Sequence, residues 1–170
     1  ICWSLVGSEM CIRDSDMDYE DTNSWTLTLL ANDNNGASDV GTVAITLTDV
    51  DEFDVSAPTD SDTGTNTVAE DAADGTTVGL TALSSDADGT TNTITYSATA
   101  NSCTDDDGHA AFAVDANTGV VTVNDRAALD YETSQTCTIT VRATSQDTST
   151  ADTTFSVSYT HLTLPTINWV

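Results

Sequence analysis

The stretch Asp130-Tyr131-Glu132, continued by TSQTCTITVRA to Ala143, decides the fold. A turn-forming acidic start is followed by alternating apolar and polar residues, which predicts a strand with one buried face. The tripeptide Asp18-Tyr19-Glu20 begins the same pattern 112 residues earlier, and this offset aligns residues 27–31 with 139–143 without a gap. The sequence therefore contains two copies of one module, of which the first lacks its N-terminal half.

The composition excludes several classes of partner. The 170 residues include 28 acidic and only 3 basic ones, for a formal net charge of −25. Without a basic patch the chain cannot neutralise phosphates, so nucleic acid and anionic membrane surfaces are not expected partners. No apolar run approaches the roughly 18 residues of a membrane-spanning segment. Divalent cations are the partners that this charge favours.

Short alternating segments separated by turn residues continue through the second copy. The predicted strands are 67–70, 76–83, 92–99, 112–115, 120–123, 136–143 and 153–156. Seven such strands predict an all-β fold, an immunoglobulin-like Greek-key β-sandwich. Its predicted core consists of Ile94, Tyr96, Phe112, Val114, Val121, Ile139 and Val141.

The two ends of the chain are related to each other at the DNA level. Codons that encode residues 9–15 have a reverse complement that encodes residues 157–162. We therefore expect residues 1–15 and 157–170 to derive from translated sequencing-adapter DNA, and we exclude them from functional reasoning. The predicted organisation is a partial module at 16–52, a polar linker at 53–66 and a complete module at 67–156, whose last strand adapter residues can extend.

Asp49-Val50-Asp51-Glu52 places three carboxylates in four residues where the first module ends. Carboxylates at this density repel one another unless a cation lies between them. The tetrapeptide is therefore predicted to be half of a calcium site.

Further motifs follow in a fixed order along residues 16–156. They are Val68-Ala69-Glu70, Asp86-Ala87-Asp88-Gly89, Phe112-Ala113-Val114-Asp115 with Thr118-Gly119, and Leu129-Asp130-Tyr131-Glu132. Together with residues 49–52, these motifs resemble the cadherin repeat. The long Asp-rich linker is closer in style to bacterial cadherin-like arrays of large surface proteins than to animal cadherins.

The resemblance implies Ca²⁺ bound between consecutive repeats. Carried over to matching positions, the ligands of the joint inside this chain are Asp18, Glu20, Asp49, Asp51, Glu52, Asp86 and Asp88, with the backbone oxygen of Asn92 as a further candidate. An incomplete downstream joint would use Glu70, Asp130 and Glu132, and an incomplete upstream joint would use Asp33. Ligands that are all oxygen favour calcium over magnesium when several loops supply them.

The sequence also departs from the family pattern. Ser145 stands where the family's Ala-x-Asp motif has its aspartate, so one ligand is lost. At the offset of 112, His161 and Thr163 occupy the positions of Asp49 and Asp51, so the adapter residues cannot complete the downstream calcium site.

Other candidate sites are weaker. Cys103 and Cys137 could form a disulfide or remain two free thiols, and the secreted context favours the disulfide. Residues 60–64 begin like an EF-hand loop but lack its spacing, and residues 105–108 are interpreted as an acidic solvated turn. His109 is interpreted as a surface residue, and no nucleophile motif or phosphate loop is present, so no enzymatic activity is expected.

The sequence as a whole predicts a calcium-stiffened module of an extracellular or cell-surface adhesion protein. Its expected partners are neighbouring repeats of the same chain and another cell-surface protein or glycan. The alternatives are an accessory spacer or carbohydrate-binding domain of a secreted enzyme, and a structural stalk with no adhesive partner.

Overall fold

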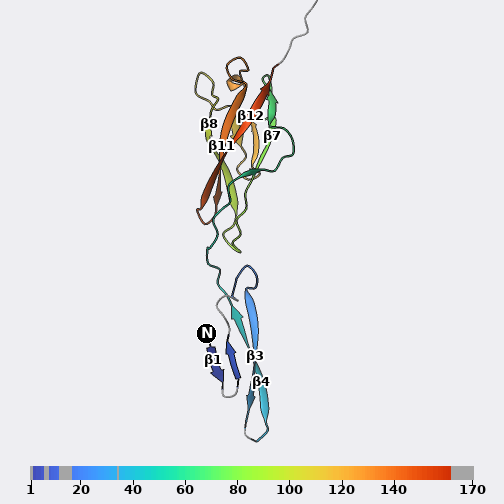
Figure 1. Cartoon of the computed structure of the whole chain (residues 1–170), viewed down its shortest axis with the longest axis vertical. Coiled ribbons are helices and arrows are strands. Elements are labelled where there is room, and N and C mark those ends of the chain that lie inside the picture. Colours follow the sequence, from blue (N-terminus) through green and yellow to red (C-terminus); the bar gives the residue numbers. More distant parts are fainter. Residues whose placement is uncertain (1, 6–7, 12–16, 34, 162–170) are drawn as a thin grey trace, which may run out of the picture. The chain divides into compact units, whose positions relative to one another are not determined.

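The computed structural model describes residues 2–5, 8–11, 17–33 and 35–161 (Figure 1). The chain divides into two compact units, one formed by residues 1–52 with 88–90 and the other by 53–87 with 91–170. In the described ranges the regular structure is β, apart from the short 3-10 turn Arg126–Ala128.

The second unit contains two four-stranded sheets (Figure 1). One has the order β5 (Thr59–Asp60), β7 (Thr77–Leu83), β10 (Val120–Val123) and β9 (Phe112–Val114). The other has the order β6 (Thr67–Ala69), β12 (Thr150–Thr160), β11 (Thr136–Ser145) and β8 (Ile94–Asn101). All neighbours are antiparallel except β6 and β12, which run parallel. The predicted β-sandwich is confirmed.

The core of this sandwich is built from the inward-facing residues of alternating strands. Phe112, Leu80 and Ile139 are at most 1% exposed and are among the largest fully buried side chains. The predicted core residues Tyr96, Phe112, Val121, Ile139 and Val141 are buried, and Ile94 and Val114 pack against them partly buried. The period-two pattern of β11, in which every second residue is buried, is the pattern that the sequence predicted.

A close approach of two backbones explains the glycine of the Thr118-Gly119 motif. Gly119 has a φ of +70°, and a Cβ there would collide with the carbonyl oxygen of Ala82. Asp115 closes the same turn, since its Oδ1 accepts hydrogen bonds from the backbone N–H groups of Asn117 and Thr118 at 3.0 and 2.8 Å. The turn that joins β9 to β10 therefore needs both residue types.

The sandwich also includes residues outside the predicted module. In the segment predicted to be a linker, Val55 and Pro58 are buried and Thr59–Asp60 forms β5. At the other end, β12 continues past residue 156, and Val157 and Tyr159 are 0% and 5% exposed. Residues assigned to adapter DNA thus complete the last strand.

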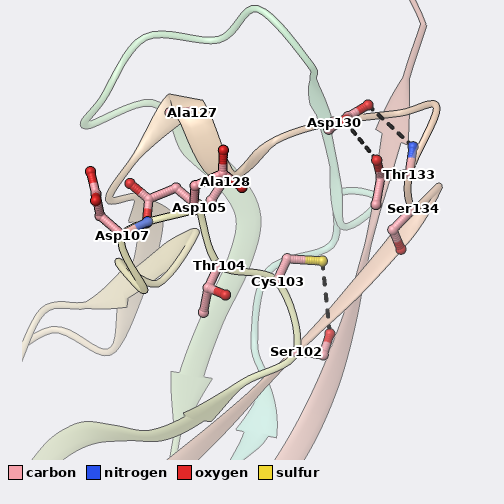
Figure 2. Close-up of a pocket in the computed structure, with 11 residues that line it drawn as sticks. Ser102, Cys103, Thr104, Asp105, Asp107, Ala127, Ala128, Asp130, Thr133 and Ser134 are labelled. Atoms are coloured by element: carbon pink, nitrogen blue, oxygen red, sulfur yellow. Dashed lines mark hydrogen bonds between the residues drawn. The ribbon is translucent and has the colours of Figure 1, made fainter.

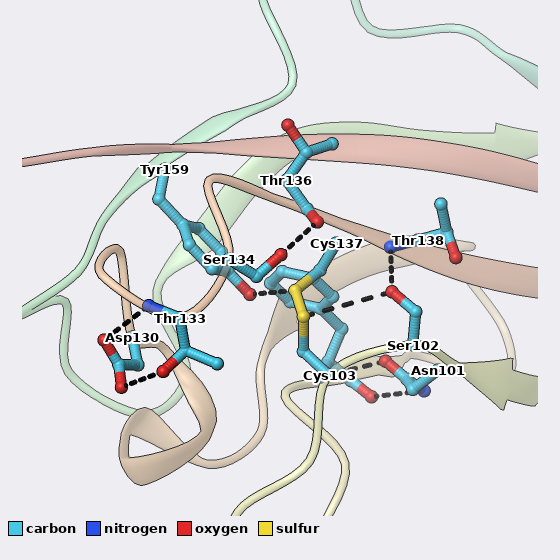
Figure 3. Close-up of a disulfide and its surroundings, with 11 residues drawn as sticks. Asn101, Ser102, Cys103, Asp130, Thr133, Ser134, Thr136, Cys137, Thr138 and Tyr159 are labelled. Atoms are coloured by element: carbon cyan, nitrogen blue, oxygen red, sulfur yellow. Dashed lines mark hydrogen bonds between the residues drawn. A yellow bond between two sulfur atoms is a disulfide. The ribbon is translucent and has the colours of Figure 1, made fainter.

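A disulfide joins Cys103, in the loop after β8, to Cys137 of β11 (Figure 3). Their Cα atoms are 5.7 Å apart. The Tyr159 hydroxyl donates a hydrogen bond to the Cys137 Sγ at 2.6 Å, and burial raises the pKa of Tyr159 to about 12. Of the two interpretations of these cysteines, the structure has the disulfide.

The described residues of the first unit form two hairpins, β1 (Cys2–Leu5) with β2 (Ser8–Cys11) and β3 (Ser24–Asn32) with β4 (Ser38–Thr46). In β3–β4, Ser24 pairs with Thr46 and Asn32 pairs with Ser38. In β11–β12, Thr136 pairs with Ser158 and Thr144 pairs with Thr150. Every one of these partners is shifted by the same 112 residues, so the internal repeat extends to the strand register.

Candidate metal centre

The Asp-Tyr-Glu motif forms the same turn in both units. Asp18 Oδ1 accepts the backbone N–H of Glu20 at 3.0 Å, and Asp130 Oδ1 accepts the backbone N–H of Glu132 at 3.0 Å. An aspartate that bonds the backbone two residues onward stabilises a tight turn. Asp18 and Asp130 therefore hold the turn, and each sets the position of the glutamate that follows it.

In the first unit, the loop of residues 88–90 brings the predicted calcium ligands together. The backbone N–H of Gly89 donates to Glu20 Oε1 at 2.9 Å, and that of Glu52 donates to Asp88 Oδ1 at 3.1 Å. Asp49 Oδ2 accepts the backbone N–H of Thr90 at 2.7 Å and also its hydroxyl. Four carboxylates consequently place ligand oxygens within 4.8 Å of one another, and we call them the carboxylate cluster: Glu20, Asp49, Glu52 and Asp88.

The loop itself requires a glycine. A Cβ on Gly89 would lie 2.7 Å from the ring of Tyr19. The aromatic residue of the Asp-Tyr-Glu motif therefore packs over the backbone that donates to Glu20, and only glycine leaves room for it.

The carboxylate cluster contains one buried oxygen that accepts no hydrogen bond from the described residues and one carboxyl whose charged form is disfavoured by its surroundings. Asp49 Oδ1 is buried without a hydrogen-bond partner in the described part of the chain. Hydrogen bonds from Thr90 hold the pKa of the Asp49 carboxyl below its usual value. For Glu52, desolvation and then the charges of Glu20, Asp49 and Asp88 raise the pKa. An ionised Asp49 beside crowded carboxylates is an arrangement that could hold a cation.

The other residues predicted for this joint are distributed differently. Asp51 has a carboxylate oxygen within 4.8 Å of one on the 2% exposed Asp88. Asp86 and Asn92 belong to the second unit, where the Ser145 hydroxyl donates to Asp86 Oδ2. Ser145, which stands where the family has an aspartate, thus donates a hydrogen bond to the Asp86 carboxylate and adds no second negative charge beside it.

The residues predicted for each incomplete joint do not all come together. In the second unit Glu70 and Glu132 meet at His161, whereas Asp130 accepts the Thr133 backbone N–H and hydroxyl at 3.2 and 2.7 Å. Those hydrogen bonds lower the pKa of Asp130. In the first unit, Asp33 Oδ1 accepts the backbone N–H groups of Asn35 and Ala37 at 2.9 and 2.8 Å and closes a turn.

The acidic turn of residues 105–107 lines a cavity of about 550 Å³ (Figure 2). Asp130 and Thr133 lie on the opposite side of it. His109 Nδ1 lies 2.9 Å from Asp105 Oδ2, and this contact raises the pKa of His109 and lowers that of Asp105. The Asp105 carboxylate therefore has its partners in the turn itself, namely His109 and the backbone N–H of Asp107.

A model of the cadherin domain family matches residues 59–160. This chain belongs to the cadherin family. The match covers both sheets of the second unit and ends where β12 ends. Cadherin domains are adhesion modules and not typically enzymes. No curated protein matches the sequence.

Solved structures of cadherin domains have the same fold. Protocadherin Gamma B2 extracellular cadherin domains 3-6 match with a TM-score of 0.65 and 23% identity, over 85% of this chain and 34% of that one. Mouse clustered PcdhgC3 EC1-3 matches with a TM-score of 0.63 and 27% identity, over 85% and 45%. This cadherin chain spans less than half the length of either. Across its described residues, no helix is long and apolar enough to cross a membrane.

Sequence reasoning had no role for Thr90, which donates twice to Asp49. It named Gly89 only as part of a motif, without its contact to Tyr19. The signal for Gly89 is its place directly after Asp88, because an aspartate followed by glycine marks a tight loop. A lone threonine in a Thr-rich sequence carries no comparable signal.

Proposed function

We propose that this chain is a calcium-binding cadherin module of an extracellular adhesion protein, in which calcium stiffens the junction between consecutive repeats. The observation that carries the proposal is the carboxylate cluster, whose four ligand oxygens lie within 4.8 Å of one another. A set of carboxylate oxygens from several loops suits the flexible, 6- to 8-fold coordination of Ca²⁺. Asp51 can add a further oxygen from the same tetrapeptide.

Two features of the cluster support a bound cation. The buried, unpartnered Oδ1 of Asp49 would gain a partner. The charges that raise the pKa of Glu52 would be neutralised, so that Glu52 could stay ionised as a ligand. Both effects make the folded first unit more favourable when the metal is bound.

Calcium at this cluster would also act on the junction between repeats. The loop 88–90 makes its contacts with the first unit, while the residues on either side of it, 87 and 91, belong to the second. A cation bound to Asp88 and to the residues of 18–52 would therefore restrain both units. We expect the repulsion of the unneutralised carboxylates to loosen the junction when calcium is removed.

The test is a calcium titration of the full chain by calorimetry, together with thermal unfolding in CaCl₂ and in EDTA. At a calcium concentration of 100 times the Kd, mass action predicts a rise of about 2.7 kcal/mol in the free energy of unfolding. Small-angle scattering should report a narrower distribution of chain dimensions with calcium than with EDTA. Magnesium should have a weaker effect, because it demands octahedral geometry.

The variants Asp49→Asn and Glu52→Gln should weaken calcium binding by about tenfold or more, since each removes a charged ligand. Asp39→Asn is the matched control: it removes one charge from an exposed residue of β4, in the same unit. If Asp39→Asn weakened binding as much as Asp49→Asn, the effect would be one of net charge. Identical melting curves in CaCl₂ and EDTA would exclude the calcium proposal.

A further inference from the structure

The second unit carries far more negative charge than its predicted calcium ligands explain. Its residues, 53–87 and 91–170, include 16 acidic side chains and two arginines, for a formal net charge of −14 with histidines neutral. Four of the acidic residues are predicted calcium ligands: Glu70, Asp86, Asp130 and Glu132. The other 12 are all aspartates. Calcium at the predicted ligands would therefore leave most of this charge in place.

Positive side chains neutralise few of these 12 aspartates. Arg142 Nε lies 2.7 Å from Asp152 Oδ1. His109 Nδ1 lies 2.9 Å from Asp105 and 3.6 Å from Asp125. In the described part of the second unit the other nine aspartates form no ion pair, and the sequence contains no lysine that could supply one. The charge of this unit is consequently balanced from solution.

Backbone N–H groups fix several of these aspartates in turns. Asp60 Oδ1 accepts the backbone N–H of Asp62 at 3.0 Å, and Asp62 Oδ1 accepts that of Gly64 at 2.7 Å. Hydrogen bonds from Thr118 lower the pKa of Asp115. Such bonds favour the ionised carboxylate, but an N–H group carries no net charge. The repulsion between aspartates of different turns therefore remains in the folded state.

The repulsion is concentrated where several aspartates face one space. The cavity of about 550 Å³ beside the acidic turn is lined by Asp105, Asp106, Asp107 and Asp130 (Figure 2). A hollow lined by charges of one sign focuses the electric field and raises the local concentration of counter-ions. Cations from the medium should therefore gather at this end of the sandwich without a fixed binding position.

We propose that the second unit is adapted to a medium of high ionic strength, in which a diffuse atmosphere of monovalent cations stabilises its fold. A net charge far from zero destabilises a compact state through self-repulsion. The screening length in salt solution falls from about 30 Å at 0.01 M to about 3 Å at 1 M, so salt weakens the repulsion between separate turns. This effect is independent of the proposed calcium site, whose carboxylates belong to the first unit.

The test is thermal unfolding of the full chain in EDTA, followed by circular dichroism, from about 0.01 M to about 1 M NaCl. We expect the melting temperature to rise by at least several degrees over this range. KCl should give the same rise, because screening depends on the charge of the ion and not on its size. Asp49→Asn should keep the salt dependence of the parent chain, which separates this result from calcium binding.

Two matched variants change the same four exposed aspartates of the second unit: Asp54, Asp71, Asp106 and Asp107. The lysine variant carries Asp54→Lys, Asp71→Lys, Asp106→Lys and Asp107→Lys. It should melt at a higher temperature than the parent chain in low salt and respond less to NaCl. The glutamate variant has Glu at the same four positions and retains the charge, so its salt dependence should equal that of the parent chain.

Three outcomes would overturn the proposal. The first is a melting temperature of the parent chain that stays constant or falls as NaCl increases, and this result does not depend on the folding of any variant. The second is an equal salt dependence of the lysine and glutamate variants, which would mean that salt acts through something other than charge. The third is a rise that saturates in NaCl and is absent in KCl, which would indicate a specific bound ion.

Discussion

The hairpins β3–β4 and β11–β12 have the same register, yet the apolar face of β11–β12 is buried and that of β3–β4 is largely exposed. Ala143 is 0% exposed, while Ala31 at the corresponding position is exposed. Likewise Val141 is 0% exposed, whereas its counterpart Leu29 is 38% exposed. The alternation in the sequence specifies which face of a hairpin is apolar, but only the strands packed against that face bury it.

The largest effect in this comparison should come from shortening one inward-facing side chain in each hairpin. Ile139→Ala removes a fully buried side chain, and we expect it to lower the free energy of unfolding by about 2 to 5 kcal/mol. Leu27→Ala, the matched change in β3, should cost much less because Leu27 is only half-buried. Denaturant unfolding followed by circular dichroism measures both. Equal losses would show that the two faces are equally packed.

The second-largest effect should come from the disulfide. Cys137 is the first inward-facing residue of β11, and its counterpart in β3 is Trp25. The Cys103–Cys137 bond closes a loop with a sequence separation of 34. Replacing both cysteines by serine should destabilise the second unit by about 2 to 4 kcal/mol, chiefly by freeing the unfolded chain.

The control is to measure the melting temperatures of the parent chain and of the serine variant with and without a reducing agent. Dithiothreitol should lower the melting temperature of the parent chain toward that of the variant and leave the variant unchanged. A parent chain whose melting temperature ignores the reductant would contradict the predicted contribution of the disulfide.

The smallest effect should come from the outward face. Arg142 of β11 and Asp152 of β12 form a two-bonded ion pair, with both nitrogen–oxygen distances 2.7 Å. Leu30 and Val40 form the corresponding pair in the first unit and are 61% and 59% exposed. Because surface ion pairs contribute little, Arg142→Leu with Asp152→Val should shift the melting temperature by no more than a few degrees.

This pair also predicts a dependence on pH. The hydrogen bonds from Arg142 lower the pKa of Asp152 below its usual 3.8. The pair therefore stabilises the fold fully above pH 3.8 and loses its contribution as the pH falls through the lower pKa of the folded state. Acid titration of stability should be less steep in the double variant than in the parent chain. A steeper titration would mean that Asp152 is not stabilised by Arg142.

The strands and the register were predictable because alternation and the 112-residue repeat are properties of the sequence itself. The strand β5 was not, since two residues give no period and Thr59–Asp60 is recognised only by its pairing with Leu83 and Ala82. The extension of β12 past residue 156 was expected from the sequence, because the alternation continues through Val157 and Tyr159.

The candidate site was predictable in its carboxylates and less so in their partners. Glu20, Asp49, Glu52 and Asp88 stand out because acidic residues recur at matching positions of a repeat. Sequence could not tell that Asp86 would bond to Ser145, since that contact depends on where the end of β11 lies in space. Nor could it tell that Glu70 and Glu132 would meet His161 while Asp130 turned to Thr133.

The parallel pairing of β6 with β12 has a mechanical consequence. The Ser158 N–H donates to the Asn66 carbonyl at 2.9 Å, and the Glu70 N–H donates to the Thr160 carbonyl at 3.3 Å. Since both strands run the same way, tension applied to the chain before residue 66 and after residue 160 pulls them past each other lengthwise. The bonds between them then bear the load together in shear and do not open one at a time, as they would if a hairpin were unzipped.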